Sequence, residues 1–307
     1  MFSYRHSFHA GNHGDVLKHI CQMLIINKLK SKDKGFVYID THSGAGLYDL
    51  AGDEAKKTNE YAHGIARVST YQGNNQAILD YQALCAKYLR HNQYPGSPEI
   101  ANSMLREQDS AVLMEWHNQE IDNLKNNIRG TNVAIHHRDG YEGLIAMTPP
   151  RLPRGMVLID PSYEVADEYQ QVVDTVSQTY KRWTTGIYAI WYPLLSSRVR
   201  SAKDDTFYAS GKSGLSEQML ASLAQQNFKN LLTIEMCVAD EDQYAGMYGT
   251  GMAIINAPWQ LDEQMQTCLE ELTPLLSQGA EKQSQSANGQ PNKASFSIKW
   301  LLKDRDN

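Results

Sequence analysis

The sequence Val157-Leu158-Ile159-Asp160-Pro161-Ser162-Tyr163 decides how this chain folds. A short apolar run of strand type ends abruptly at a carboxylate. This is typical of a buried parallel strand whose carboxyl end opens into a ligand crevice. Asp160 to Tyr163 then supply a hydrogen-bond acceptor, a stiffened backbone and a flat aromatic face. Together these groups suit a planar ring that carries an exocyclic amine.

Outward from this segment, strand patterns alternate with helix patterns. Strands are predicted at 36–40, 111–115, 132–136, 156–160, 186–192, 231–238, 251–256 and 296–300. Helices are predicted at 15–30, from 98 to about 106, and at 119–128, 167–182, 217–226 and 261–276. This alternation predicts an α/β fold with a mostly parallel, doubly wound sheet.

One region departs from the alternation. Residues 47–93 contain no convincing strand and show helix patterns instead, so we expect a helical subdomain inserted into a domain formed by 1–46 and 94–307. Residues 1–14 are irregular, aromatic and rich in histidine, and are predicted to form an ordered arm. Residues 280–291 are rich in Gln, Ser and Asn, a composition typical of disordered segments.

The charge of the chain is unevenly distributed. With 307 residues it can bury a full α/β core. Its net charge of -6 argues against a protein that wraps a polyanion, but residues 1–34 hold six Lys/Arg and two acids. That segment carries +4 and the remainder -10, which favours a local nucleic-acid contact. A solvated helix face is the alternative for Lys28 to Lys34.

Cysteine and histidine spacing indicates neither disulfides nor a metal. The four cysteines are far apart and form no CxxC pair, so we expect reduced thiols in a cytoplasmic protein: Cys21, Cys85, Cys237 and Cys268. No signal peptide or membrane span is expected. The histidines near the N-terminus match no standard zinc pattern, so no metal is predicted.

Glycines follow the first predicted strand, in Asp40-Thr41-His42-Ser43-Gly44-Ala45-Gly46. Glycines in this position let a ligand approach the backbone closely. A dinucleotide site would place a third glycine three residues after Gly46, where this chain has Asp49. The motif therefore favours an adenosine that carries an amino-acid tail, S-adenosylmethionine, over a dinucleotide. A plain strand–helix turn is the alternative.

Four acids stand at the ends of successive predicted strands: Asp40, Glu115, Asp139 and Asp160. A single acid there is more often a cap or turn residue, but four in series favour a ligand site. Glu115 is placed to accept hydrogen bonds from ribose hydroxyls and Asp139 from an adenine amine. Asp160 would face the reaction centre.

Transfer to an aromatic amine explains the residue types after this last strand. The nitrogen lone pair is delocalised into the ring, so the amine is a poor nucleophile. The Asp160 carboxylate and the Pro161 carbonyl can accept its two N–H bonds and localise the lone pair, and Asp160 can take the departing proton. Tyr163 is predicted to stack on an extruded base. An ordinary Asp-Pro turn is the alternative.

Asp160-Pro161-Ser162-Tyr163 resembles the (D/N)-P-P-(Y/F/W) signature of amino-group methyltransferases. Residues 4–19, 40–46, 94–98, 105–109 and 186–193 resemble the bacterial 23S ribosomal RNA adenine-N6 methyltransferase J family, and the match runs from residue 1 to about 259. The resemblance implies a Rossmann-like methyltransferase fold with an inserted helical subdomain. It also implies S-adenosylmethionine as donor and one adenine of 23S rRNA as acceptor.

The motifs and the resemblance together assign residues to roles. The predicted catalytic residues are Asp160, Pro161 and Tyr163. The predicted cofactor-binding residues are Lys18, His19, Asp40, His42, Gly44, Ser97, Glu115, Asp139, Gly140 and Asp160. The predicted RNA-binding residues are Tyr4, Arg5 and His6. Ser162 departs from the second proline of the signature, which restores an N–H and loosens φ.

Three alternatives stay open. The preferred acceptor is naked or partly assembled 23S rRNA, because an adenine buried in a folded ribosome is costly to flip out. The acceptor could instead be a DNA adenine or a protein glutamine. The change at Ser162 could also leave a methyltransferase-like RNA-binding protein without turnover.

Overall fold

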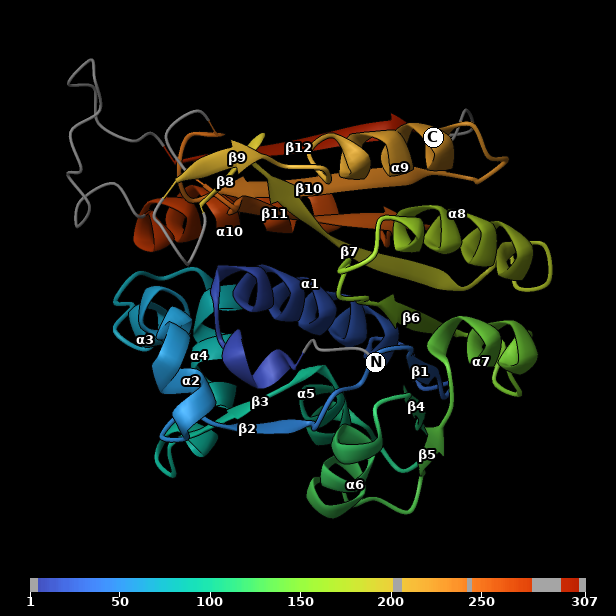
Figure 1. Cartoon of the computed structure of the whole chain (residues 1–307). Coiled ribbons are helices and arrows are strands. Elements are labelled where there is room, and N and C mark those ends of the chain that lie inside the picture. The colour runs from blue at the N-terminus through green and yellow to red at the C-terminus, as the bar shows by residue number, and fades with distance from the viewer. Residues whose placement is uncertain (1–4, 201–205, 242–244, 278–293, 304–307) are drawn as a thin grey trace.

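This computed structural model describes residues 5–200, 206–241, 245–277 and 294–303 (Figure 1). Two predictions, the RNA contact of Tyr4 and the disorder of 280–291, lie outside these residues. The helices are α1 (His13–Lys30), α2 (Asp53–Thr58), α3 (Ile65–Val68), α4 (Gln76–Leu89), α5 (Ser97–Met104), α6 (Asn118–Asn127), α7 (Gly140–Met147), α8 (Asp167–Tyr180), α9 (Leu215–Ala224) and α10 (Leu261–Leu276), with 3-10 turns η1 (His6–Phe8) and η2 (Glu60–His63).

The strands form one large sheet and two small ones. They are β1 (Val37–Asp40), β2 (Leu47–Asp49), β3 (Gln93–Pro95), β4 (Ser110–Glu115), β5 (Val133–His137), β6 (Gly155–Ile159), β7 (Ile187–Leu195), β8 (Arg198–Arg200), β9 (Phe207–Ala209), β10 (Leu231–Cys237), β11 (Met247–Ile255) and β12 (Ser295–Leu302).

The large sheet has eight strands in the order β12-β10-β11-β7-β6-β1-β4-β5. Strands β5, β4, β1, β6 and β7 are parallel neighbours. Strand β11 is antiparallel to β7 and to β10, and β12 is antiparallel to β10, so only β11 and β12 run against the rest. The predicted α/β fold with a mostly parallel sheet is confirmed.

Strand β6 shows why residues 156–159 are continuously apolar. Met156 and Leu158 pack into one hydrophobic cluster and Val157 and Ile159 into the other, because successive side chains point to opposite faces. Helices α1, α5, α6 and α10 contribute to the first cluster, and α7, α8 and α9 to the second (Figure 1). A strand covered on both faces has no exposed position to fill with a polar residue.

Residues 47–93 hold α2, η2, α3 and α4, so this segment is mainly helical. The segment begins with a strand that the sequence did not indicate: β2 pairs antiparallel with β3. Three residues are too few to show an alternating pattern. Ile78, Tyr81 and Cys85 of α4 belong to the same hydrophobic cluster as α1 and α10, so this segment packs directly on the main domain.

Two further features were not predicted. Helix α7 is only eight residues long and contains Gly140 and Gly143, which weaken a helix pattern. The β8–β9 hairpin has three residues in each strand. No helix among the residues that the structure describes is long and apolar enough to cross a membrane.

Candidate active site

A cavity opens at the carboxyl ends of β1, β4 and β6. It is lined by ten of the residues predicted to bind cofactor, RNA or the reacting amine: His6, Lys18, His19, His42, Gly44, Ser97, Glu115, Asp139, Gly140 and Asp160. The carboxyl ends of adjacent parallel strands meet at one edge of the sheet, which is why side chains so distant in sequence converge. Among the described residues, no group of three or more His, Cys, Asp or Glu side chains could hold a metal ion.

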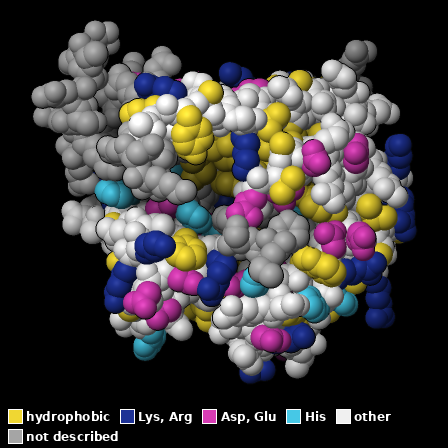
Figure 2. Space-filling view, viewed as in Figure 1, with side chains coloured by type: hydrophobic (Ala, Val, Ile, Leu, Met, Phe, Trp, Pro, Cys, Tyr) yellow, Lys and Arg dark blue, Asp and Glu magenta, His cyan; other side chains and the backbone are white. Residues whose placement is uncertain are grey.

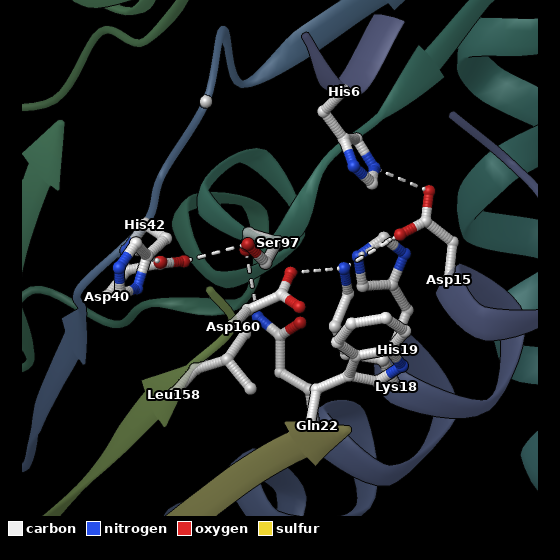
Figure 3. Close-up of polar contacts among 12 residues, drawn as sticks. His6, Asp15, Lys18, His19, Gln22, Asp40, His42, Ser97, Leu158 and Asp160 are labelled. Atoms are coloured by element: carbon white, nitrogen blue, oxygen red, sulfur yellow. Dashed lines mark hydrogen bonds and ion pairs between the residues drawn. The ribbon is translucent and has the colours of Figure 1, made fainter. Parts of the chain in front are cut away.

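An ion-pair chain connects Asp160 to α1 (Figure 3). Asp160 follows β6 directly, and its Oδ2 lies 2.5 Å from Nζ of Lys18. The same Nζ lies 2.7 Å from Oδ1 of Asp15. Burial alone would lower the pKa of Lys18, but the carboxylates of Asp15 and Asp160 outweigh it and raise that pKa, so the amine stays charged. Lys18 therefore fixes one oxygen of Asp160.

Asp15 is the buried counter-ion of this chain. Burial raises its pKa, but the nearby His6 and Lys18 side chains outweigh burial and hold the pKa well below its usual value. His6 Nε2 lies 2.9 Å from Asp15 Oδ2, so the N-terminal arm is attached to the same carboxylate. Sequence reasoning gave Asp15 only a role at the helix start. The i,i+3 spacing of Asp15 and Lys18 was the available signal for their pairing.

His19 presents an unpartnered nitrogen. Its Nδ1 lies 2.8 Å from the Tyr94 hydroxyl, while its buried Nε2 has no hydrogen-bond partner and lies 4.0 Å from Asp15 Oδ1. Burial lowers the pKa of His19 to about 3, so the ring is neutral at physiological pH. A buried polar atom without a partner costs free energy unless a ligand satisfies it. His19 therefore marks a ligand position in the cavity wall.

Asp40 lies behind the cavity wall, which corrects the expectation that it contacts the cofactor directly. Its Oδ2 accepts hydrogen bonds from the hydroxyls of Tyr38 and Ser97, both at 2.7 Å, and its Oδ1 accepts one from His42 N–H at 3.2 Å. It is fully buried, and burial raises its pKa to about 6. Asp40 holds Ser97 and His42 in place, and these two residues line the cavity.

Glu115 also lines the cavity. Its Oε2 accepts a hydrogen bond from Gly44 N–H at 2.7 Å, and its Oε1 accepts one from His117 N–H at 2.6 Å. Gly44 has φ +56°, and a Cβ there would lie 2.1 Å from the Tyr48 hydroxyl. Glycine is thus required for the loop to approach its neighbours this closely. Beside Glu115, Trp116 is 55% exposed at the cavity rim.

Asp139 caps α7 with a single oxygen. Its Oδ1 accepts hydrogen bonds from Tyr141 N–H at 3.0 Å and Glu142 N–H at 2.9 Å. A Cβ on Gly140 would lie 2.0 Å from the Thr41 carbonyl oxygen, so the start of α7 and the loop after β1 are in direct contact. This contact brings Asp139 close to the loop that follows β1.

The loop after Asp160 corrects the expectation that Tyr163 stacks on an extruded base. The Tyr163 ring is only 2% exposed, so it offers no open face for a base. Its hydroxyl donates to the Trp191 carbonyl at 2.8 Å, and its ring packs 4.3 Å from that of Tyr169. Burial of the ring against other aromatic side chains explains this position. In this structure Tyr163 anchors the loop; Pro161 is also buried, and Ser162 lines the cavity.

Two of the predicted RNA-binding residues, Arg5 and His6, lie in the described part of the arm and contact acidic side chains. Arg5 pairs with Glu54, and its Nε lies 3.7 Å from Glu120 Oε1. His6 lines the cavity and contacts Asp15, as described above. The described part of the arm therefore contacts α2 and α6, and its His6 lies at the cavity.

The parallel sheet and the acids around this cavity define a methyltransferase of the Rossmann-like α/β class. The family model described as "Ribosomal RNA large subunit methyltransferase D, RlmJ" matches residues 33–286. The chain belongs to this RlmJ family.

Known relatives agree with this assignment. The chain is 41% identical over 274 residues to Ribosomal RNA large subunit methyltransferase J of Escherichia coli, covering 88% of this chain and 92% of the relative. It is 41% identical over 283 residues to the protein of the same name from Haemophilus influenzae, covering 90% and 94%. A solved structure from Legionella pneumophila has a TM-score of 0.78 and 31% identity, covering 95% of this chain and 98% of that one.

Proposed function

We propose that this protein transfers a methyl group from S-adenosylmethionine to N6 of an adenine in naked or partly assembled 23S ribosomal RNA. One observation carries the proposal: Asp160, with one oxygen bound by Lys18, shares a cavity with Glu115 and Asp139. The names of the curated relatives specify the large-subunit ribosomal RNA as their substrate.

The cavity fits this cofactor at both ends. Glu115 would accept hydrogen bonds from the ribose hydroxyls, and Asp139, whose Oδ1 caps α7, would accept one from the adenine amine. His19, whose Nε2 has no hydrogen-bond partner, lines the same cavity as Ser97 and His42, and these three residues would bind the polar tail. When bound, the cofactor supplies a methyl group on a positively charged sulfur.

Asp160 would orient the acceptor amine. Because Lys18 occupies Oδ2, the other carboxylate oxygen is available for an N–H of the amine. The Pro161 carbonyl would accept the second N–H. The nitrogen lone pair would then be localised on nitrogen instead of delocalised into the ring, and would point toward the methyl group. The carboxylate then accepts the proton released from nitrogen. By binding Oδ2, Lys18 keeps the whole carboxylate, including the acceptor oxygen, in one orientation throughout.

The test is the methylation of 23S rRNA transcripts by the wild-type protein and by Asp160→Asn, with mass mapping of the modified adenine. We expect the variant to lose at least about 100-fold in kcat, since general acid–base groups contribute that much or more. Asp174→Asn, on the exposed side of α8, is the matched control and should retain full activity.

Three outcomes would contradict the proposal. Full activity of Asp160→Asn would remove the carboxylate from the reaction. Methylation of duplex DNA or of a protein glutamine in preference to RNA would favour another acceptor. Binding of RNA and of the cofactor without turnover by the wild-type protein would favour an RNA-binding protein that has lost catalysis.

A further inference from the structure

The β8–β9 hairpin exposes two large aromatic side chains. Phe207 is 58% exposed and Tyr208 is 55% exposed, so each ring presents more than half of its surface to solvent. The two strands pair with each other and not with the large sheet. Exposed aromatic groups on a small ribbon gain nothing from the core, which points to a binding role.

The hairpin is also basic, although the chain as a whole carries a net charge of -6. The guanidinium carbon of Arg198 lies 5.6 Å from the centroid of the Phe207 ring. Arg198, Arg200 and Lys212 are the charged residues of 198–200 and 206–212, and the charged residues Lys203, Asp204 and Asp205 lie outside the described residues. Figure 2 shows hydrophobic and Lys/Arg side chains together over the position that β8 and β9 occupy in Figure 1.

The hairpin lies at the same edge of the sheet as the cavity. It continues from the carboxyl end of β7, which is the parallel neighbour of β6 and so ends at the same edge of the sheet as Asp160. Directly after β9, Lys212 Nζ donates to the Tyr163 carbonyl at 2.9 Å. This bond connects the base of the hairpin to the loop that carries the reacting carboxylate.

We propose that the β8–β9 hairpin binds the RNA strand next to the target adenine, with Phe207 and Tyr208 stacking on flanking bases and Arg198 meeting the phosphates. This inference rests on the proposed function. Single-stranded RNA fits the surface because aromatic rings and guanidinium groups stack on unpaired bases, and the positive charge complements the backbone. The negative body of the protein confines the RNA to this side.

The test is the Phe207→Ala/Tyr208→Ala double variant in 23S rRNA methylation. We expect KM for RNA to rise about tenfold or more, since each stacked base contributes about that factor, while kcat and cofactor binding stay unchanged. The matched control is Trp259→Ala. Trp259 is 69% exposed and follows β11, whose end pairs with the start of β7, so it lies at the opposite edge of the sheet. Its loss should leave KM unchanged.

Photocrosslinking separates failure of this inference from failure of the proposed function. An rRNA crosslink to the peptide containing Phe207 and Tyr208 supports the hairpin contact even if the wild-type protein methylates nothing. An active wild-type protein with no crosslink there, and with an unchanged KM in the double variant, overturns the inference. A hairpin that binds a protein instead of RNA would also give no crosslink and an unchanged KM. The variant Phe207→Tyr/Tyr208→Phe keeps both rings and should keep the wild-type KM.

Discussion

At the scale of single residues, Lys18 is the centre of the site. Lys18 is 3% exposed, and its ammonium lies between the carboxylates of Asp15 and Asp160. Two carboxylates in such a position are compatible only with a positive charge between them. The stability of the site and the orientation of Asp160, the proposed reacting carboxylate, therefore depend on the same side chain.

Lys18→Met should lower both stability and activity. Removal of one partner of a buried ion pair leaves the others uncompensated, so we expect a loss of about 3 kcal/mol in the free energy of unfolding. Methyl transfer should fall about 100-fold or more, because Asp160 loses its fixed orientation. Chemical denaturation and rRNA methylation measure the two effects. Lys28→Met, an exposed position of the same helix, is the control, and equal effects at both positions would contradict this account.

Asp40 should make stability depend on pH. Its folded pKa of about 6 lies above the usual Asp value, so the folded protein binds this proton more tightly than the unfolded chain does. The Asp40 contribution to stability is then fully present below about pH 4 and is lost as pH rises through 6, by about 3 kcal/mol in total.

Chemical denaturation of the wild-type protein and of Asp40→Asn, across this pH range, measures the difference. In the wild-type protein, Asp40 Oδ2 accepts hydrogen bonds from the hydroxyls of Tyr38 and Ser97. The asparagine carbonyl of the variant can accept the same two bonds. The wild-type protein should lose stability relative to the variant between about pH 4 and 6. Parallel pH curves for the two proteins would show that Asp40 titrates normally.

At the scale of elements, α1 positions one side of the site. Asp15, Lys18, His19 and Gln22 share one helix face, and Gln22 Nε2 donates to the Ser97 carbonyl at 2.8 Å. The helix begins where Asn12 Oδ1 accepts a hydrogen bond from Asp15 N–H at 3.0 Å. The cap thus lies within two turns of Lys18.

Loss of this cap should weaken the site. Asn12→Ala should cost about 1 kcal/mol in the free energy of unfolding, because an N-cap oxygen is lost. Asn12→Ser retains such an oxygen and should cost less, although both variants lose the bond from Asn12 Nδ2 to Glu60 Oε2. Thermal denaturation and methylation assays compare them. Equal losses in both variants would assign the effect to Glu60 and not to the cap.

At the scale of the whole molecule, one hydrophobic cluster connects the inserted segment to the main domain. Tyr81 and Leu84 of α4, Ile20 of α1 and Leu269 of α10 all belong to it. Segments that share a core unfold together. The cavity, in turn, draws residues from α1, from the loops after β1, β4 and β6, and from the start of α5.

S-adenosylmethionine should therefore stabilise the entire protein in one transition. At about 100 times its Kd, a ligand that binds only the folded state adds about 2.7 kcal/mol, which corresponds to a rise of roughly 5 °C in Tm for a chain of this size. Differential scanning calorimetry with and without the cofactor measures it, and removal of the cofactor should restore the original Tm. Two transitions, only one of which shifts, would show that residues 47–93 unfold separately.

The sequence alone determined the sheet and the acids at its edge. A covered strand must be apolar at every position, so the pattern of 156–159 and the acid that follows are local properties of the chain. The glycines after β1 are likewise needed for a local backbone conformation, at φ +56° for Gly44 and +76° for Gly46. The short strand β2 and the short helix α7 were not predicted, because so few residues cannot show a clear hydrophobic periodicity.

Only the tertiary structure decided which side chains meet. Lys18 and Asp160 are 142 residues apart, and no sequence pattern specifies a contact over that distance. The same holds for the burial of Tyr163 beneath Trp191 and for Asp40 behind Ser97. A residue's type and its place at a strand end are set by its neighbours in the chain, whereas its exposure and charge partners are set by how distant segments pack.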